Sequence, residues 1–491
     1  MEGVRWLLLL AVAAAAASAG VVGAQCLSAD DGPGGGAGAE AEVAALRAAR
    51  ADFALALLRE AATGPGGAPL VSPASAFDAL LLALAGAANR TEDALRATLR
   101  LPAHLGKAAA LRALRSEALL RAAEAHALAL DRPREEEDGE EEEGDGEQAA
   151  LKPSDAPERE GLRTANRVFV AENVTLRECV KELLGADQES LAVAADPEAA
   201  AARVNAWVSE QTAGHIKQLV PALRPDAQLV LVNAAFFRGA WAARFPRNRS
   251  ALAVFHSAPD RRALVPMMRQ KGSFNYVVSE RLGAHALELP FARGGFSLLL
   301  LLPPFSSAAV PGAAAAEGRS AEGGAGGVEL GVDALLRRLD APALAELLRD
   351  LDGAAQTVEV HVPRLALDAD IDLVPVLERM GAGDAFQPSA DYSGFTGSRG
   401  PSFDGARQRA RLDADEEGAT AAAATALFLF RSARPAEPAR FVANHPFALL
   451  LLRKQAALAG LPAASDSPPA DVLFAGVYRG PTPGPAPAHK Q

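Results

Sequence analysis

The order of helical and strand patterns along the chain constrains its fold more than any other feature. Apolar residues recur at helical spacing from Glu40 onward, and further helical stretches cover residues 74–101, entered at Ser72-Pro73, and residues 106–129. Short apolar runs typical of buried strands dominate from residue 167 onward. Because strands and helices do not alternate regularly and no sequence repeat is present, the pattern predicts one α+β domain of about 440 residues.

The strand-like runs are short and rich in Val, Leu and Phe. They are Arg167–Val170, Leu229–Phe237, Ala286–Leu289, Phe296–Leu302, Val358–Val362, Phe447–Leu452 and Val472–Tyr478. The run at 296–302 is too short to cross a membrane and is followed by Pro303-Pro304. It therefore predicts a buried strand.

The N-terminus has the pattern of a secretory signal peptide. Arg5 precedes the apolar stretch Trp6 to Ala17, and small residues suit cleavage near Ala19 or Ala24. A membrane anchor is the alternative, because the weakly polar run to Ala24 is just long enough to span. We expect export, with a signal peptide at 1–24, a disordered linker at 25–39 and no membrane contact, so that the protein is secreted to the extracellular space.

An exported chain of this size with two cysteines must be held together by a large core. A single bridge between Cys26 and Cys179 is possible, although the sequence alone does not show it. Three Asn-x-Ser/Thr triplets mark candidate glycosylation sites at Asn89, Asn173 and Asn248.

Three low-complexity insertions interrupt the predicted domain at 40–482, and a flexible tail follows at 483–491. The insertions are an acidic one at 134–160, a Gly/Ala-rich one at 306–327 and another at 455–470. The run from Glu135 to Glu147 carries ten of the negative charges behind the net charge of −12. The rest of the chain is nearly balanced, and nothing in that balance indicates a nucleic-acid-binding protein, which would need clustered Lys and Arg.

No constellation of an enzyme or a metal site is visible. The eight histidines are scattered, and no Gly-x-Ser-x-Gly or phosphate-binding loop occurs. The glutamate run lacks the spaced ligands and the turn glycine of a calcium loop. We therefore expect no catalytic residue, no metal and no cofactor.

The most informative segment begins at Asp415 and ends at Pro435. It contains Glu416-Glu417-Gly418, the small residues Ala419 to Ala426, the bulkier run Leu427 to Phe430, and then Arg431-Ser432-Ala433-Arg434. An alanine-rich helix is one interpretation. The segment instead lies between a probable strand and the strand at 447–452, and the following prolines break regular structure. Exposed arginines in such a place are what a trypsin-like protease cleaves.

In this segment the chain resembles the serpin family. Glu416-Glu417-Gly418 with Ala421 to Ala424 is similar to the serpin hinge, and Asn444-His445-Pro446-Phe447 is similar to the strand after the reactive loop. Other blocks in the same order are Ser72-Pro73-x-Ser75, Asn205-x-Trp207-Val208, Leu231-Val232-Asn233 through Trp241, Leu287 to Phe291, His361-x-Pro363-Arg364 and Phe474-Ala475-Gly476. The resemblance covers about residues 40–482 and is strongest to secreted arthropod inhibitors.

The resemblance implies a large central β-sheet, further sheets, about nine helices and an exposed reactive-centre loop. It also implies a mechanism in which a protease forms an acyl-enzyme with the loop, and the cleaved loop then inserts into the central sheet as a strand. Ala419, Ala421, Ala423 and Thr425 would face inward. The implied hinge comprises Glu416, Glu417, Gly418, Ala419, Thr420, Ala421, Ala422, Ala423 and Ala424.

The position of the reactive bond stays open between neighbouring residues. Counting from Gly418 by the family's spacing places the acyl-forming residue at Ser432, and counting back from Pro446 places it near Arg434. Chemistry favours Arg431-Ser432, because arginine fits an acidic specificity pocket through paired hydrogen bonds. Proteases cleave poorly before a proline such as Pro435, and Phe430 would suit a chymotrypsin-like enzyme.

We therefore expect a covalent complex with a trypsin-like serine protease of an extracellular cascade. The alternatives are a non-inhibitory serpin that acts as a carrier or chaperone, and a membrane-tethered binding module. Asn233, Trp241 and His361 match sheet-opening positions of the family and are interpreted as core residues. Glycosaminoglycan is a further candidate partner, through Lys107, Arg115 and Arg121. A separate hypothesis is that the acidic tract 134–147 engages a basic exosite on the protease or covers helix 106–129.

Overall fold

The structure is a computed structural model that describes residues 39–63, 70–130, 161–258, 261–292, 295–305, 331–398, 400–416, 438–454 and 469–481. The signal peptide, the acidic and Gly/Ala-rich insertions and the tail predicted above lie outside these residues, as does most of the linker and of the insertion at 455–470. The first helix begins at Ala39 and the last strand at Ala470, one residue inside the predicted linker and insertion. None of the described helices is long and apolar enough to span a membrane.

The elements follow the predicted order, with helices concentrated first and strands later. The helices are α2 (Ala39–Ala62), α3 (Pro73–Gly86), α4 (Asn89–Thr98), α5 (Lys107–Leu130), α6 (Glu178–Leu184), α7 (Pro197–Gln211), α8 (Val332–Arg338), α9 (Ala341–Leu351), α10 (Val374–Arg379) and α11 (Ser393–Thr396). The strands are β1 (Leu70–Val71), β2 (Gly161–Ala171), β3 (Gln188–Leu191), β4 (Leu229–Arg238), β5 (Ala251–Ala258), β6 (Arg261–Ser279), β7 (Ala284–Pro290), β8 (Phe296–Leu302), β9 (Ala355–Pro363), β10 (Leu365–Asp372), β11 (Phe403–Ala414), β12 (Ala439–Val442), β13 (Phe447–Lys454) and β14 (Ala470–Tyr478).

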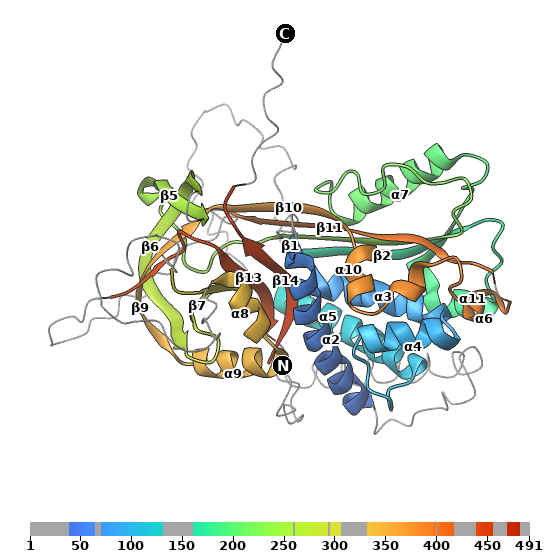
Figure 1. Ribbon diagram of the computed structural model, residues 1–491, viewed down its shortest axis with the longest axis horizontal. Helices are drawn as coiled ribbons and strands as arrows, with labels where there is room; N and C mark the ends of the chain where they lie inside the picture. The colour runs from blue at the N-terminus through green and yellow to red at the C-terminus, as the bar shows by residue number, and fades with distance from the viewer. Residues whose placement is uncertain are drawn as a thin grey trace, which may run out of the picture.

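A five-stranded sheet with the order β10-β11-β4-β2-β3 runs along the long axis of the molecule (Figure 1). Helices α2 to α5 lie on one side of it and α7 on the other (Figure 1). Alternate side chains of β4 pack on the two faces of this sheet. Leu229 and Leu231 join the core under α3, whereas Val232, Ala234 and Phe236 pack with Val204 and Trp207 of α7. This double burial explains the almost uninterrupted apolar sequence of β4.

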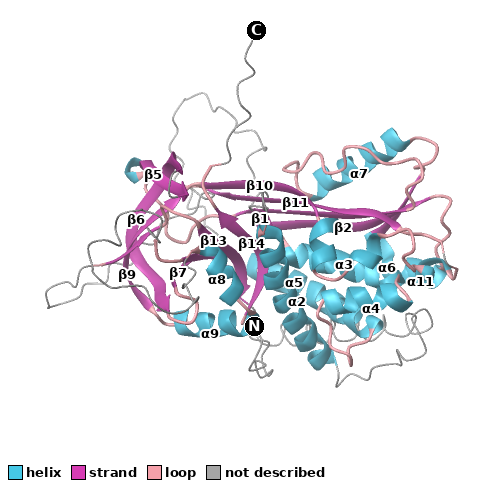
Figure 2. Ribbon diagram, viewed as in Figure 1, coloured by secondary structure: helices cyan, strands magenta, loops and turns pink. Residues whose placement is uncertain are grey.

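The remaining strands form a nine-stranded sheet at the other end of the molecule, with the order β1-β14-β13-β8-β7-β6-β9-β12 and β5 paired to β6. Figure 2 shows these strands curving past α8 and α9. Strand β13 is antiparallel to β8 on one side and to β14 on the other. The predicted buried strand at 296–302 is β8, and all seven predicted strand runs lie within strands of the structure.

Local sequence signals explain where several helices begin. Asp196 precedes Pro197 at the start of α7, and its side chain accepts a hydrogen bond from the Ala199 N–H at 2.9 Å. Asp340 caps α9 in the same way, with 2.8 Å to the Ala343 nitrogen. A carboxylate and a proline in these positions satisfy and preset the first helical turn.

Candidate functional site

The boundary between β4 and β11, called the seam here, is a parallel pairing flanked by two antiparallel ones; β2 and the edge strand β3 form the other parallel pair of the five-stranded sheet. These two central strands are parallel, with register partners running from Phe403 and Leu229 to Asp413 and Arg238. Each is antiparallel to its outer neighbour, β2 or β10. The chain leaves β11 after Ala414, is described as far as Glu416, and is described again from Pro438, just before β12. The segment with the predicted reactive bond thus connects the end of β11 to the start of β12.

A buried polar cluster lies on the helix-facing side of the seam. Gln408 of β11 accepts a hydrogen bond from the Ser72 backbone N–H at 2.9 Å and donates to the Ser72 carbonyl at 2.8 Å and to Asn233 Oδ1 of β4. Asn233 Nδ2 donates to Ser75 Oγ at 2.7 Å and to Asn166 Oδ1 of β2 at 2.6 Å. Because Gln408 and Asn233 are buried, each bond avoids the cost of an unpaired polar group. The cluster ties β11, β4 and β2 to the start of α3.

Trp241 binds the chain where it leaves the C-terminal end of β11. Its indole Nε1 donates to the Asp415 carbonyl at 2.7 Å, and its ring stacks on Phe291 with centroids 4.4 Å apart. Arg238, at the end of β4, lies 3.8 Å from the Asp415 carboxylate. The first residues after β11 are therefore held against the end of β4 and not directed freely into solvent.

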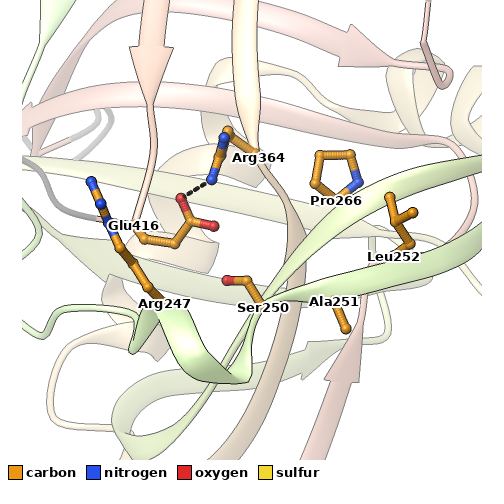
Figure 3. A pocket seen from close by; sticks show the side chains of 7 residues that line it. All are labelled: Arg247, Ser250, Ala251, Leu252, Pro266, Arg364 and Glu416. Carbon is orange, nitrogen blue, oxygen red and sulfur yellow. Dashed lines mark hydrogen bonds and ion pairs between the residues drawn. The ribbon is translucent and has the colours of Figure 1, made fainter.

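Glu416 lines an open groove of about 490 Å³ beside this end of the sheet, together with Arg247, Ser250, Ala251, Leu252, Pro266 and Arg364 (Figure 3). Its carboxylate accepts a hydrogen bond from Arg364 at 2.6 Å, and the side chain is only 3% exposed. Burial alone would raise the pKa of the Glu416 carboxyl group. Hydrogen bonds to the carboxylate and the charge of Arg364 outweigh burial and hold that pKa below its usual value. The anchor point of the segment is therefore an ion pair between the buried carboxylate of Glu416 and the half-exposed guanidinium of Arg364.

Of the predicted hinge and reactive bond, only Glu416 lies within the described residues. Glu417 to Ala424 and the bond Arg431-Ser432 lie outside them, as does the alternative Arg434. Among the candidate core residues, Asn233 and Trp241 lie at the seam. His361 lies on β9 of the other sheet, where its Nε2 is 2.9 Å from Glu359.

The candidate glycosylation residues Asn89, Asn173 and Asn248 are all exposed, and the Asn89 amide donates to Asp391 at 2.8 Å. Cys179 is disulfide-bonded, and the other cysteine, Cys26, lies outside the described residues. Within the described part of the chain, no group of three His, Cys, Asp or Glu residues could hold a metal ion.

Two basic residues in the first half of helix α5 make contacts within the protein. Lys107 is 2.6 Å from Glu92, and Arg112 donates to Glu42 at 3.1 Å. Only 12% of the Lys107 side chain is exposed. A sulfated polysaccharide would have to compete with the carboxylates of Glu92 and Glu42 for these basic side chains. Glycosaminoglycan binding stays a prediction.

Sequence reasoning did not single out Gln408 or the pairing of Arg364 with Glu416. Gln408 stands in the alternating stretch Arg407-Gln408-Arg409-Ala410-Arg411, whose charges resemble a surface strand. Its one signal is parity, since it shares a face with Ala406, Ala410 and Leu412, which are all buried.

Comparison with known proteins identifies this arrangement. The family described as Serpin (serine protease inhibitor) matches residues 48–459. Serine protease inhibitor 88Ea of Drosophila melanogaster is 29% identical over 428 residues, which is 84% of each chain. Human serpin B3 is 32% identical over 292 residues, covering 58% of this chain and 69% of the human protein.

Solved structures agree on the fold. Serpin-12 of Manduca sexta superposes with a TM-score of 0.63 at 23% identity, covering 88% of this chain and 98% of that one. Serpin48 of Tenebrio molitor gives a TM-score of 0.58 at 24% identity, covering 89% and 98%. The predicted serpin fold is therefore confirmed, and so is the expectation that the chain is no enzyme, because the matched family consists of protease inhibitors. The seam, the anchor at Glu416 and the family match together show that this chain belongs to the serpin family.

Proposed function

We propose that this serpin is a secreted inhibitor that traps a trypsin-like serine protease as a suicide substrate in an extracellular proteolytic cascade. The observation that carries the proposal is the closed seam between β4 and β11, which is continuous in sequence with a segment of small residues. The protease would attack the segment, form an acyl-enzyme, and be displaced with the segment before the ester is hydrolysed.

The strand directions of the seam favour insertion. A segment that turns back after Ala414 runs antiparallel to β11, and therefore also antiparallel to β4, because those two strands are parallel. Insertion would replace one parallel pairing with two antiparallel pairings, which are slightly more stable per residue. The number of ladder hydrogen bonds at the seam would roughly double. The intact sheet is thus poised to gain stability once the segment is cut.

The side chains of the segment meet the requirements of the seam. The helix-facing side of the seam is buried at Asn233, Gln408 and Ala410. Every second residue of an inserted strand must enter this core. Ala419, Ala421, Ala423 and Thr425 have the matching parity and are small. A charged residue there would cost about 1–3 kcal/mol or more in desolvation.

The proposed bait is the bond between Arg431 and Ser432. The serine of the protease would attack the Arg431 carbonyl carbon, and the Ser432 amine would leave. Arginine matches a specificity pocket that carries a carboxylate, since its guanidinium forms paired charge-assisted hydrogen bonds. The next arginine, Arg434, precedes Pro435 and is a poorer site.

The test is incubation with trypsin, denaturing gel electrophoresis for a covalent adduct, and mass determination of the C-terminal fragment. A fragment that begins at Ser432 supports the proposed bond, and one that begins at Ala433 or Pro435 moves the bond. The matched variants are Arg431→Ala, which should abolish the adduct, and Arg434→Ala, which should leave it. Wild-type protein that is cut without forming an adduct and without a higher melting temperature would contradict trapping.

Secretion is supported by the signal-peptide pattern before residue 24 and by the exposure of Asn89, Asn173 and Asn248. Expression of the full chain in insect cells should deliver the protein to the medium with a new N-terminus near residue 20 or 25. Retention of the uncut N-terminus in the membrane fraction would instead support the anchor.

A further inference from the structure

Strands β5 and β6 carry an exposed apolar surface at one edge of the nine-stranded sheet. Among the described strands, β5 pairs with β6 alone. On the face turned to solvent, Leu252 is the register partner of Pro266, and Val254 is the register partner of Leu264. Leu252 is 66% exposed and Leu264 is 64% exposed. Contiguous exposed apolar side chains of this kind often mark a surface that binds something.

Strand β5 also lacks the residues that usually protect an exposed edge. Its eight residues include no Lys, Arg, Asp, Glu or Pro, and such residues normally prevent an edge from pairing with another chain. The far end of the strand is covered, because the His256 N–H donates to the Asn444 carbonyl at 2.8 Å. The surface that needs a cover is therefore the beginning of β5, around Leu252.

The groove that contains Glu416 adjoins this beginning of β5. Leu252 and Pro266 line one end of the groove, whereas Arg364 and Glu416 line the other (Figure 3). One end is thus apolar, and the other carries charged groups that form hydrogen bonds. A sugar ring has the same division, with C–H groups on its faces and hydroxyl groups around its rim. The lining therefore matches a sugar better than a purely apolar or a purely ionic ligand.

The candidate glycosylation site at Asn248 lies within the stretch of chain that forms this groove. Arg247 precedes it and Ser250 to Leu252 follow it, and all of these residues line the groove. Asn248 itself is exposed, in the single 3₁₀ turn η5 (Arg247–Arg249). A glycan attached to its side chain therefore begins beside the groove.

We propose that the groove is a docking site for the first N-acetylglucosamine residues of a glycan on Asn248, which pack on Leu252 and Pro266 and cover the open beginning of β5. The inference rests on the proposed secretion, because the Asn-x-Ser triplet is used in exported chains, and it does not depend on trapping. The hydroxyl groups of the sugars accept hydrogen bonds from the half-exposed guanidinium of Arg364. The glycan thus shields an edge that is otherwise open to pairing with a second chain.

The experiment measures how fast peptide N-glycosidase releases the Asn248 glycan from protein secreted by mammalian cells, with glycopeptide mass spectrometry as the readout. The enzyme must reach the bond between the asparagine and the first sugar, so a docked sugar slows its release. We expect release from the native protein to be slow and release from the denatured protein to be fast.

The decisive comparison is between Leu252→Ser and the matched variant Leu264→Ser. The two leucines are exposed to a similar extent on the same face, but of the two only Leu252 lines the groove. Native release at Asn248 should be about fivefold faster in Leu252→Ser, because the apolar contact with the sugar is lost, and unchanged in Leu264→Ser.

A second measurement tests whether the glycan covers the surface. Asn248→Gln should increase the fluorescence of anilinonaphthalene sulfonate, a dye that binds exposed apolar patches, whereas Asn173→Gln should not. The double variant Asn248→Gln/Leu252→Ser should return the fluorescence toward the wild-type value.

Equal native release rates in the wild type and both serine variants would overturn the proposal, and so would secreted protein without a glycan on Asn248. Concentration-dependent dimerisation of the glycosylated wild type that Leu252→Ser abolishes would assign the surface to a second copy of the chain and also overturn it. A retained chain with an uncut N-terminus and no glycan would refute the proposed secretion and this inference together. Secreted protein with a fully accessible Asn248 glycan would refute the docking alone.

Discussion

Replacement of Gln408 by alanine should lower the free energy of unfolding of the intact protein by more than the loss of one hydrogen bond would. The side chain is fully buried and makes three hydrogen bonds, two with the Ser72 backbone and one with Asn233. Truncation leaves an N–H, a carbonyl and an amide oxygen without this partner. At a net value of about 1 kcal/mol per bond, the expected loss is about 3 kcal/mol.

The matched control is Gln270→Ala. Gln270 is also buried, but its side chain makes one hydrogen bond, to the Ala243 carbonyl at 3.2 Å, and no bond to the polar cluster of Gln408 and Asn233. The expected loss there is about 1 kcal/mol. The measurement is the first unfolding transition of the intact protein in guanidinium chloride, followed by far-ultraviolet circular dichroism. Equal losses for the two variants would refute the idea that the polar cluster holds the seam.

Three further perturbations address the anchor, the segment and the surface. The pKa of Glu416 is lowered in the folded protein, so its ion pair stabilises the fold fully above the unfolded pKa of about 4.3 and is lost as the pH falls through the lower folded pKa. The melting temperature of the wild-type protein should therefore fall more between pH 6 and pH 3 than that of Glu416→Gln. Parallel pH profiles of the two melting temperatures would contradict this. Ala421→Glu should turn the inhibitor into a substrate, with at least a tenfold rise in the moles consumed per mole of trypsin trapped, whereas Ala422→Glu, of opposite parity, should change this ratio much less. Asn173→Gln and Asn248→Gln should each remove one glycan from protein secreted by insect cells, and an unchanged mass would show that the exposed triplet is unused.

The apolar strands could be predicted from the sequence because both of their faces are buried. Most of β4, β8 and β13 consists of apolar runs, which periodicity analysis detects directly. Strands β6 and β10 were not among the predicted runs, and β11 was expected only as a strand without bounds before Asp415. Each mixes buried positions with more exposed, mostly polar or charged ones, and in an alanine-rich chain such a pattern is hard to distinguish from a loop.

The candidate site could be predicted only in part, for a related reason. Glu416 was found through the motif that it shares with a family. Its partner Arg364 lies 52 positions earlier in the sequence, and no local pattern links the two. The same holds for Gln408 and Ser72, which are separated by 336 positions. Contacts between distant segments depend on the topology of the sheet, which a single sequence does not determine.

Strand β13 has a consequence for what proteolysis would leave behind. It lies inside the nine-stranded sheet between β8 and β14, and its residues Phe447 to Leu452 are buried. A break at residue 431 would therefore produce two polypeptides that stay interlocked through this sheet. The nicked protein should elute from a sizing column at the volume of a single intact molecule, and its shorter piece should separate only when the whole fold is dissolved.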